Sequence, residues 1–167
     1  MELLLNTLKK LVIESSSKSM DMMHFWNNSP KVTDVDNTKQ MDDFMWHIID
    51  YVDFPSDGNY KRINKFIVSL VRYGLINIDL YSKMYVWLRR KVREIYSAEE
   101  NFDLTLEYVS GDDSYSDWGW HVLSLGKDNF ESLLEGYDDT IEFVETLRPI
   151  ESFTYAWPNP YDFKDIN

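Results

Sequence analysis

Apolar side chains recur at helical spacing along much of the chain. One stretch follows the pattern i, i+3, i+4, i+7, i+8, which keeps its members on one face of an α-helix: Ile63, Phe66, Ile67, Leu70 and Val71. Gly74 stands where this helix would end. A second stripe predicts a long helix over 78–96, with its apolar face formed by Tyr81, Tyr85, Leu88, Val92 and Ile95. These two segments indicate a mainly helical fold.

Further helices are expected on both sides of this pair. An amphipathic helix is expected over 2–14, where leucines recur at helical spacing. Another runs from an N-cap at Thr38 to residue 51 or 52, where the turn-forming sequence of 54–58 breaks it. Three more are expected in the last third of the chain, and their first residues or caps are Asp112, Asp128 and either Asp138 or Asp139.

Three segments give a weaker pattern. Most of 15–37 is polar and interrupted by Pro30, so we expect an irregular linker there. The apolar positions of 104–109 fit a short helix or a strand, and the pattern does not decide between them. The aromatic, proline-rich segment 148–167 has no periodicity, and we expect it to pack across its own domain, with a partner-binding segment as the alternative.

The length of 167 residues fits one domain with a core of its own. We therefore expect a mainly α protein with a single compact multi-helix domain. Its parts are an N-terminal helix and linker over 1–37, a helical domain over 38–147 and an irregular tail over 148–167 that packs on it.

Charge is divided unevenly along the chain. Residues 1–97 hold 14 basic and 12 acidic residues, whereas residues 98–167 hold 3 basic and 17 acidic ones. Such an acidic surface repels nucleic-acid phosphate, so direct nucleic-acid binding is not expected. It would speed the encounter with a basic protein partner, although an acidic surface that only maintains solubility explains the composition equally well.

The composition also bears on the compartment. The chain has no cysteine, which excludes disulfides, a thiolate nucleophile and cysteine-ligated zinc, and suits a reducing compartment such as the cytoplasm. Glu2 and the Lys9-Lys10 pair argue against a secretion signal at the start. No apolar run approaches the roughly 20 residues that a membrane-spanning helix needs, so no membrane association is expected.

Residues 111–134 carry the most specific pattern: an acidic pair, an aromatic helix and a Gly-Lys end. This stretch resembles the domain of unknown function 4240 family, and the matching positions are Asp112, Asp113, Tyr115, Trp118, Gly126, Lys127 and Phe130. Residues 44–50 look like that family's Phe-Trp-x-Ile-Ile opening, and the resemblance covers about 41–147. It implies a compact helical domain and no established chemistry.

The chain departs from that family at two places. The family's usual arginine on the aromatic helix falls at Gly119, and its Gly-Gly-Cys approach is replaced by Tyr108-Val109-Ser110. A role that depends on this arginine therefore cannot be carried over.

Candidate chemistry is sparse. Adjacent carboxylates at Asp112 and Asp113 can bind a hard cation or exchange protons, but helix capping explains them more simply. The three histidines lack the spacing of a zinc site, and no phosphate-binding loop or serine-nucleophile motif occurs. We therefore expect no catalytic residue, no metal and no cofactor.

The basic run Arg89-Arg90-Lys91 is interpreted as a solvated helix face paired with carboxylates of the same protein, with a docking patch as the alternative. Trp120 lies off the apolar stripe of its helix and is expected to be exposed. Together with nearby carboxylates it gives the candidate partner-binding set: Asp112, Asp113, Asp117, Trp120, Glu131, Glu135, Asp138 and Asp139.

These features predict an acidic protein-binding module rather than an enzyme. Within that class we expect a bacterial immunity protein that neutralises a basic toxin by covering its active surface with an acidic face. A viral inhibitor that imitates the charge of nucleic acid fits the same features, and an enzyme with a carboxylate site is a third reading. The sequence does not indicate an oligomeric state.

Overall fold

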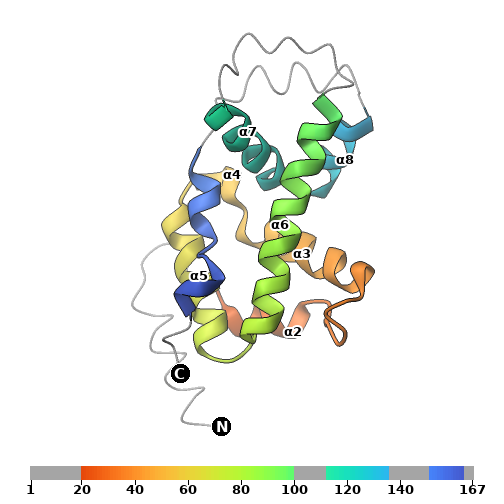
Figure 1. The fold of residues 1–167 in the computed structure, drawn as a ribbon. Helices are drawn as coiled ribbons and strands as arrows, with labels where there is room; N and C mark the ends of the chain where they lie inside the picture. The colour runs from red at the N-terminus through yellow and green to blue at the C-terminus, as the bar shows by residue number, and fades with distance from the viewer. Residues whose placement is uncertain (1–19, 100–111, 136–150, 164–167) are drawn as a thin grey trace.

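The computed structural model describes residues 20–99, 112–135 and 151–163, and in these residues every regular element is a helix (Figure 1). The α-helices are α2 (Met22–Asn28), α3 (Thr38–Val52), α4 (Phe54–Asp57), α5 (Tyr60–Arg72), α6 (Ile78–Glu99), α7 (Asp112–Ser124) and α8 (Lys127–Glu135), followed by the 3-10 turns η1 (Glu151–Ala156) and η2 (Pro160–Phe163). The predicted mainly α fold is confirmed. The helices expected over 2–14 and 138–147, and the segment 104–109, lie outside the described residues.

The segment 15–37 contains a helix that the periodicity did not predict. Helix α2 begins after Asp21, whose carboxylate accepts hydrogen bonds from the backbone N–H groups of Met23 and His24, each at 3.0 Å. Its Phe25 side chain is fully buried and packs edge-on against the ring of Phe66 on α5. The expectation of an irregular linker is therefore wrong for Met22–Asn28, which forms part of the core.

Helix α3 begins and ends close to the expected residues, and α5 ends close to the expected residue, whereas α4 was not expected. The N-cap of α3 is Asn37 rather than Thr38, because the side chain of Asn37 accepts a hydrogen bond from the backbone N–H of Gln40 at 3.0 Å. The break at 54–58 contains the short helix α4. Gly74 follows α5 with a positive φ of 69°, as expected of the residue that ends this helix.

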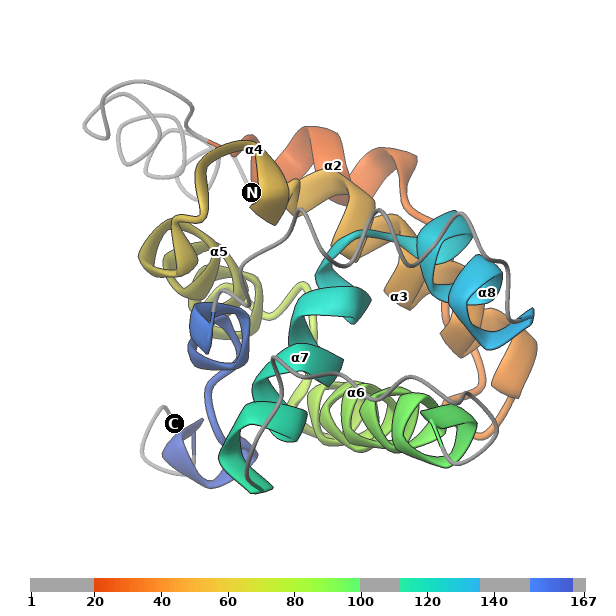
Figure 2. The same cartoon turned by 90° about the horizontal axis from the view of Figure 1, so that it is seen from above.

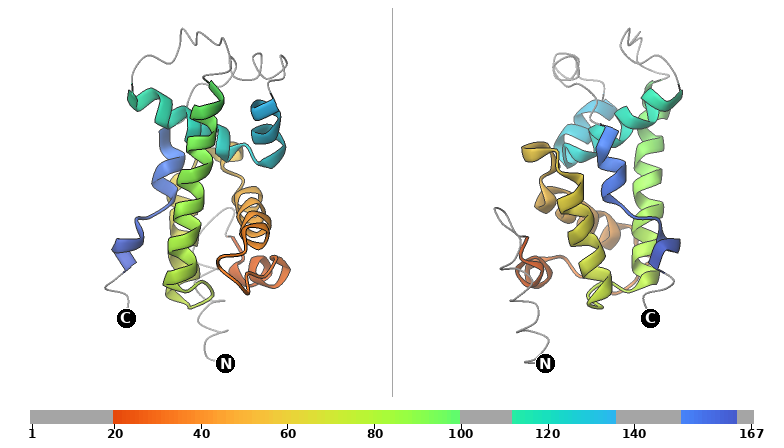
Figure 3. Two further views of the ribbon diagram at one scale, coloured as in Figure 1. Left: turned by 45° about the vertical axis from the view of Figure 1, so that its right-hand side comes forward. Right: turned by 90° about the vertical axis from the view of Figure 1, so that its left-hand side faces the viewer.

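Helix α6 runs along the full height of the molecule in two further views (Figure 3). It is longer than predicted, ending at Glu99 instead of Tyr96. The predicted stripe is buried except for Tyr85, which is only partly covered. None of the described helices, α6 included, is both long and apolar enough to cross a membrane.

Helix α7 is enclosed on more than one side. It packs against α6, α8 and η1, and its residues 118–124 are all buried (Figure 2). The helix crosses α6 closely at Gly119, where an added Cβ atom would lie 2.9 Å from Cγ1 of Val92. A helix with several packed faces carries apolar residues around its circumference rather than along a single stripe.

The tail packs on the helices over 151–163. Turn η1 contacts α5 and α7, and η2 contacts α6. Phe153, Trp157 and Phe163 are buried, and the hydroxyl of Tyr81 on α6 donates a hydrogen bond to the carbonyl of Pro158 at 2.7 Å. The tail is thus anchored by three buried aromatic side chains and by a partly buried hydrogen bond.

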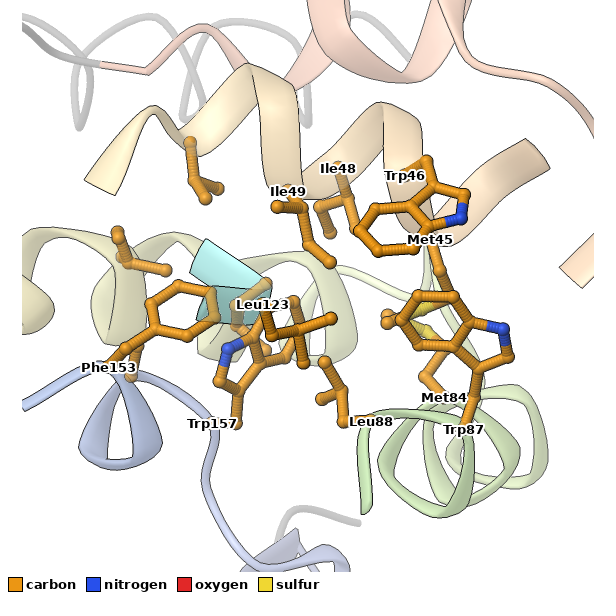
Figure 4. Close-up of a cluster of buried hydrophobic side chains, with 14 of the residues drawn as sticks. Met45, Trp46, Ile48, Ile49, Met84, Trp87, Leu88, Leu123, Phe153 and Trp157 are labelled. Atoms are coloured by element: carbon orange, nitrogen blue, oxygen red, sulfur yellow. The ribbon is translucent and has the colours of Figure 1, made fainter. Parts of the chain in front are cut away.

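The centre of the core lies where α3, α6, α7 and η1 meet (Figure 4). The labelled side chains converge from α3 (Met45, Trp46, Ile48 and Ile49), α6 (Met84, Trp87 and Leu88), α7 (Leu123) and the tail (Phe153 and Trp157). Segments far apart in sequence therefore share one hydrophobic core.

Candidate functional site

Helix α8 presents a row of carboxylates to solvent. Asp128, Glu131 and Glu135 are exposed, and their spacing of three and four residues places them on one face of the helix. We call these three residues the acidic stripe. The opposite face buries Phe130 and Leu133 in the core, so the stripe stands on a firmly packed helix.

Local sequence explains where this helix begins. Gly126 has a φ of 90°, a conformation that glycine adopts readily, and it separates α7 from α8 as predicted. Asp128 lies in the first turn of α8, where a negative charge interacts favourably with the helix dipole.

A carboxylate of α3 extends the acidic stripe across the α7–α8 turn. Oδ1 of Asp50 would lie 2.8 Å from a Cβ atom added to Gly126, so the absence of a side chain there leaves room for this carboxylate. Partial burial raises the pKa of Asp50, the negative charge of Asp128 raises it further, and His47 opposes the shift. Asp50 and Asp128 thus repel one another.

Few cations offset this charge. The side chain of Glu131 pairs with that of Lys127 at 3.6 Å, and both are about half exposed. Among the described residues, no basic side chain lies within ion-pair distance of Asp50, Asp128 or Glu135. The surface is therefore strongly negative and largely uncompensated.

The structure places the described start of α7, which carries three residues of the predicted partner-binding set, away from α8 (Figure 2). Asp112 and Asp113 open α7, although their side chains lie outside the described part of the structure, as do Asp138 and Asp139 altogether. Asp117 is partly buried on α7. The beginning of α7 lies away from α8 (Figure 2), so only Glu131 and Glu135 are brought together in the described residues.

The expectation that Trp120 is exposed is wrong. Only 6% of this residue is accessible, and its ring packs against that of Phe153 with centroids 6.4 Å apart. The prediction assumed that α7 buries only one face, the one with the apolar stripe. In the structure η1 also covers the face that carries Trp120. Trp120 cannot contact a partner on the surface of this fold.

Two of the three residues in the basic run Arg89-Arg90-Lys91 of α6 form ion pairs with carboxylates. Arg90 lies 3.7 Å from both Asp42 and Glu94, and Lys91 lies 2.9 Å from Glu94. The ammonium group of Lys91 also lies near the ring of Phe130, 5.4 Å from its centroid, and so connects α6 with α8. For these two residues the structure shows the expected pairing.

The histidines show no sign of a metal site. His24, His47 and His121 lie on α2, α3 and α7, and the described residues contain no group of three potential ligands arranged to hold a metal ion. Burial lowers the pKa of both His47 and His121. The two ring nitrogens of His121 find no hydrogen-bond partner in the described structure, and the residue is 3% exposed.

Comparison with known proteins gives no relative: no family model, no curated protein and no solved structure matches the chain. The resemblance to the domain of unknown function 4240 family stays a prediction. Its two segments fall on α3 and on α7 with α8, which are packed into one core.

Sequence reasoning missed Asp50 and gave Asp128 only the role of a cap. The spacing of Asp128, Glu131 and Glu135 is visible in the sequence and could have indicated a common face. Asp50 joins them only through the packing of α3 against the α7–α8 turn, for which the sequence holds no signal.

Proposed function

We propose that this chain is an acidic protein-binding module whose partner is a basic protein. The observation that carries the proposal is the negative charge of the acidic stripe and Asp50, of which only that of Glu131 is paired with a cation among the described residues. An arginine or lysine of a partner placed between Asp50 and Asp128 relieves their mutual repulsion, and this relief favours binding.

The geometry suits recognition by charge. The acidic stripe lies on a helix whose buried face is held by Phe130 and Leu133, so little order has to be gained when a partner binds. The net charge of −12 adds a long-range field that accelerates the encounter with a basic surface. Both features favour rapid, salt-sensitive association.

Within this class we propose an immunity protein of bacterial origin that neutralises a basic toxin. A toxin that acts on nucleic acid carries a cationic active surface, and a small acidic domain can cover it without chemistry of its own. The size, the charge and the absence of cysteine support this reading.

The test begins with affinity capture at low salt from the cells that produce the chain. The captured protein is then titrated against the native chain and against the double variant Glu131→Gln/Glu135→Gln by calorimetry. We expect one stoichiometric basic partner, with binding weakened at least about tenfold in the variant and by added salt.

A matched control removes two carboxylates elsewhere. Asp43 and Asp79 are exposed helical residues outside the acidic stripe, and Asp43→Asn/Asp79→Asn makes the same change in net charge. Equal weakening in both double variants would mean that only overall charge matters. Capture of a host nucleic-acid-binding protein would favour charge mimicry instead, and retention of no basic protein would contradict the proposal.

A further inference from the structure

The outward face of α6 has the opposite charge to the rest of the molecule. Over residues 83–93 the exposed positions of this helix are Lys83, Val86, Arg89, Arg90 and Arg93, which recur at intervals of three and four, and the exposed Asp79 lies one turn earlier on the same face. We call the five exposed residues of 83–93 the basic stripe. It stands in a chain whose net charge is −12.

The centre of the basic stripe has no carboxylate of its own. Lys83 pairs with Asp36 at 2.7 Å, and Arg90 is shared between Asp42 and Glu94. Among the described residues, no carboxylate lies within ion-pair distance of Arg89 or Arg93. Between these arginines and Lys83 stands Val86, an apolar side chain that is 63% exposed.

The acidic stripe of α8 is complementary to this surface. Arg89 and Arg93 are four residues apart on α6, and Glu131 and Glu135 are four residues apart on α8. Four residues of α-helix rise about 6 Å, so two helices laid side by side bring both pairs of opposite charges together. Antiparallel packing would also place the helix dipoles favourably.

The two stripes do not meet within one molecule. Helices α6 and α8 contact each other through their inner faces, where Lys91 lies near the rings of Trp87 and Phe130. The residues of both stripes are exposed, and no ion pair joins the two stripes among the described residues, although α8 lies beside one end of α6 (Figure 2). Mutual neutralisation therefore requires two copies.

We propose that the basic stripe of α6 docks on the acidic stripe of α8 in a second copy of this chain, giving weak head-to-tail self-association. The contact joins two different surfaces, so each copy keeps one free end and larger assemblies can grow. A second copy fits better than a nucleic acid because it supplies carboxylates at the matching helical spacing. At physiological salt the screening length of about 8 Å limits long-range repulsion between the two acidic copies. The proposal does not depend on the basic partner proposed above.

Sedimentation velocity of the purified chain, from micromolar to millimolar concentration, tests the proposal. We expect the average mass to rise with concentration and to fall when salt is added. Arg89→Glu/Arg93→Glu and Glu131→Lys/Glu135→Lys should each remain monomeric, because each loses one half of the contact. Their equimolar mixture should associate again, because the two remaining native stripes are complementary and the two charge-reversed stripes are complementary as well.

A control separates the contact from net charge. Lys61 and Lys65 are exposed and four residues apart on α5, so Lys61→Glu/Lys65→Glu makes the same charge change on another face and should associate like the native chain. Circular dichroism should show unchanged helix content in all variants. A native chain that stays monomeric at millimolar concentration would overturn the proposal, as would loss of association in the control. So would a monomeric chain whose Arg89 and Arg93 bind a single-stranded oligonucleotide.

Discussion

His121 is a polar residue in an apolar place. It lies on α7 between buried neighbours, and its two ring nitrogens have no hydrogen-bond partner in the described structure. Removal from water disfavours the charged imidazolium, so the pKa of His121 falls below its ordinary value of 6.5 on folding. The pKa of His47 is also lowered, mainly by burial. Protonation of these side chains is thus linked to unfolding.

We therefore expect stability to decrease in weak acid. Above pH 6.5 both histidines are neutral in the folded and in the unfolded chain. Below pH 6.5 the histidines of the unfolded chain become protonated, whereas those of the folded chain stay neutral to a lower pH because their pKa values are lowered. The free energy of unfolding should fall by at most about 1.4 kcal/mol per pH unit for each histidine. Urea unfolding on either side of this pH measures the slope.

Two variants test which histidine causes the dependence of the free energy of unfolding on pH. His121→Leu removes the buried imidazole and should reduce the slope to the part due to His47, whereas His24→Gln changes an exposed histidine and should leave the slope intact. An unchanged slope in His121→Leu would show that this residue is not responsible.

At the scale of elements, the contact between α6 and α7 depends on a missing side chain. Gly119 faces Val92 so closely that a Cβ atom would lie 2.9 Å from its Cγ1. An arginine, which the resembling family carries at this position, could be accommodated here only if the two helices moved apart. The departure from the family pattern therefore coincides with a close contact between two helices.

Gly119→Ala should destabilise the protein by about 1 to 2 kcal/mol. Overpacking costs about 1 to 3 kcal/mol, and the better helix propensity of alanine offsets up to about 1 kcal/mol of this. Val92→Ala removes the methyl group in conflict, so the double variant should be more stable than the sum of the single changes implies. Urea unfolding of all four proteins gives the coupling, and strict additivity would contradict this account.

The elements differ in how far their sequence predicts them. Helix α5 was predicted well because only one of its faces is buried, and α6 for the same reason. Helix α2 is too short for its periodicity to be recognised, although Asp21 is a good cap. Trp120 was misplaced because the tail covers its face, and Asp50 was missed because only tertiary packing brings it to Asp128. Contacts between distant segments leave no local pattern.

At the scale of the whole molecule, the net charge of −12 acts against the compact state. Folding brings the carboxylates of the acidic stripe and Asp50 close together, whereas the unfolded chain can spread its charges apart. The few ion pairs of the described residues are mostly well exposed, and such pairs contribute little. Screening by salt should therefore favour the folded state.

We expect the thermal midpoint at micromolar concentration to rise between about 0.05 M and about 0.5 M sodium chloride. Each kcal/mol of screened repulsion corresponds to a rise of about 2 to 4 °C. Glu131→Lys/Glu135→Lys lowers the net negative charge and should respond less to salt than the native chain. An equal response would place the repulsion elsewhere.

The position of the tail also orders events during synthesis of the chain. Proteins are made from the N-terminus, so elements made early cannot complete their packing until the elements that cover them have been made. Phe153, Ala156 and Trp157 complete the core between α5 and α7, so a nascent chain that has emerged only as far as α8 still exposes those apolar surfaces. The core of this domain is thus completed only after residues well beyond α8 have been made.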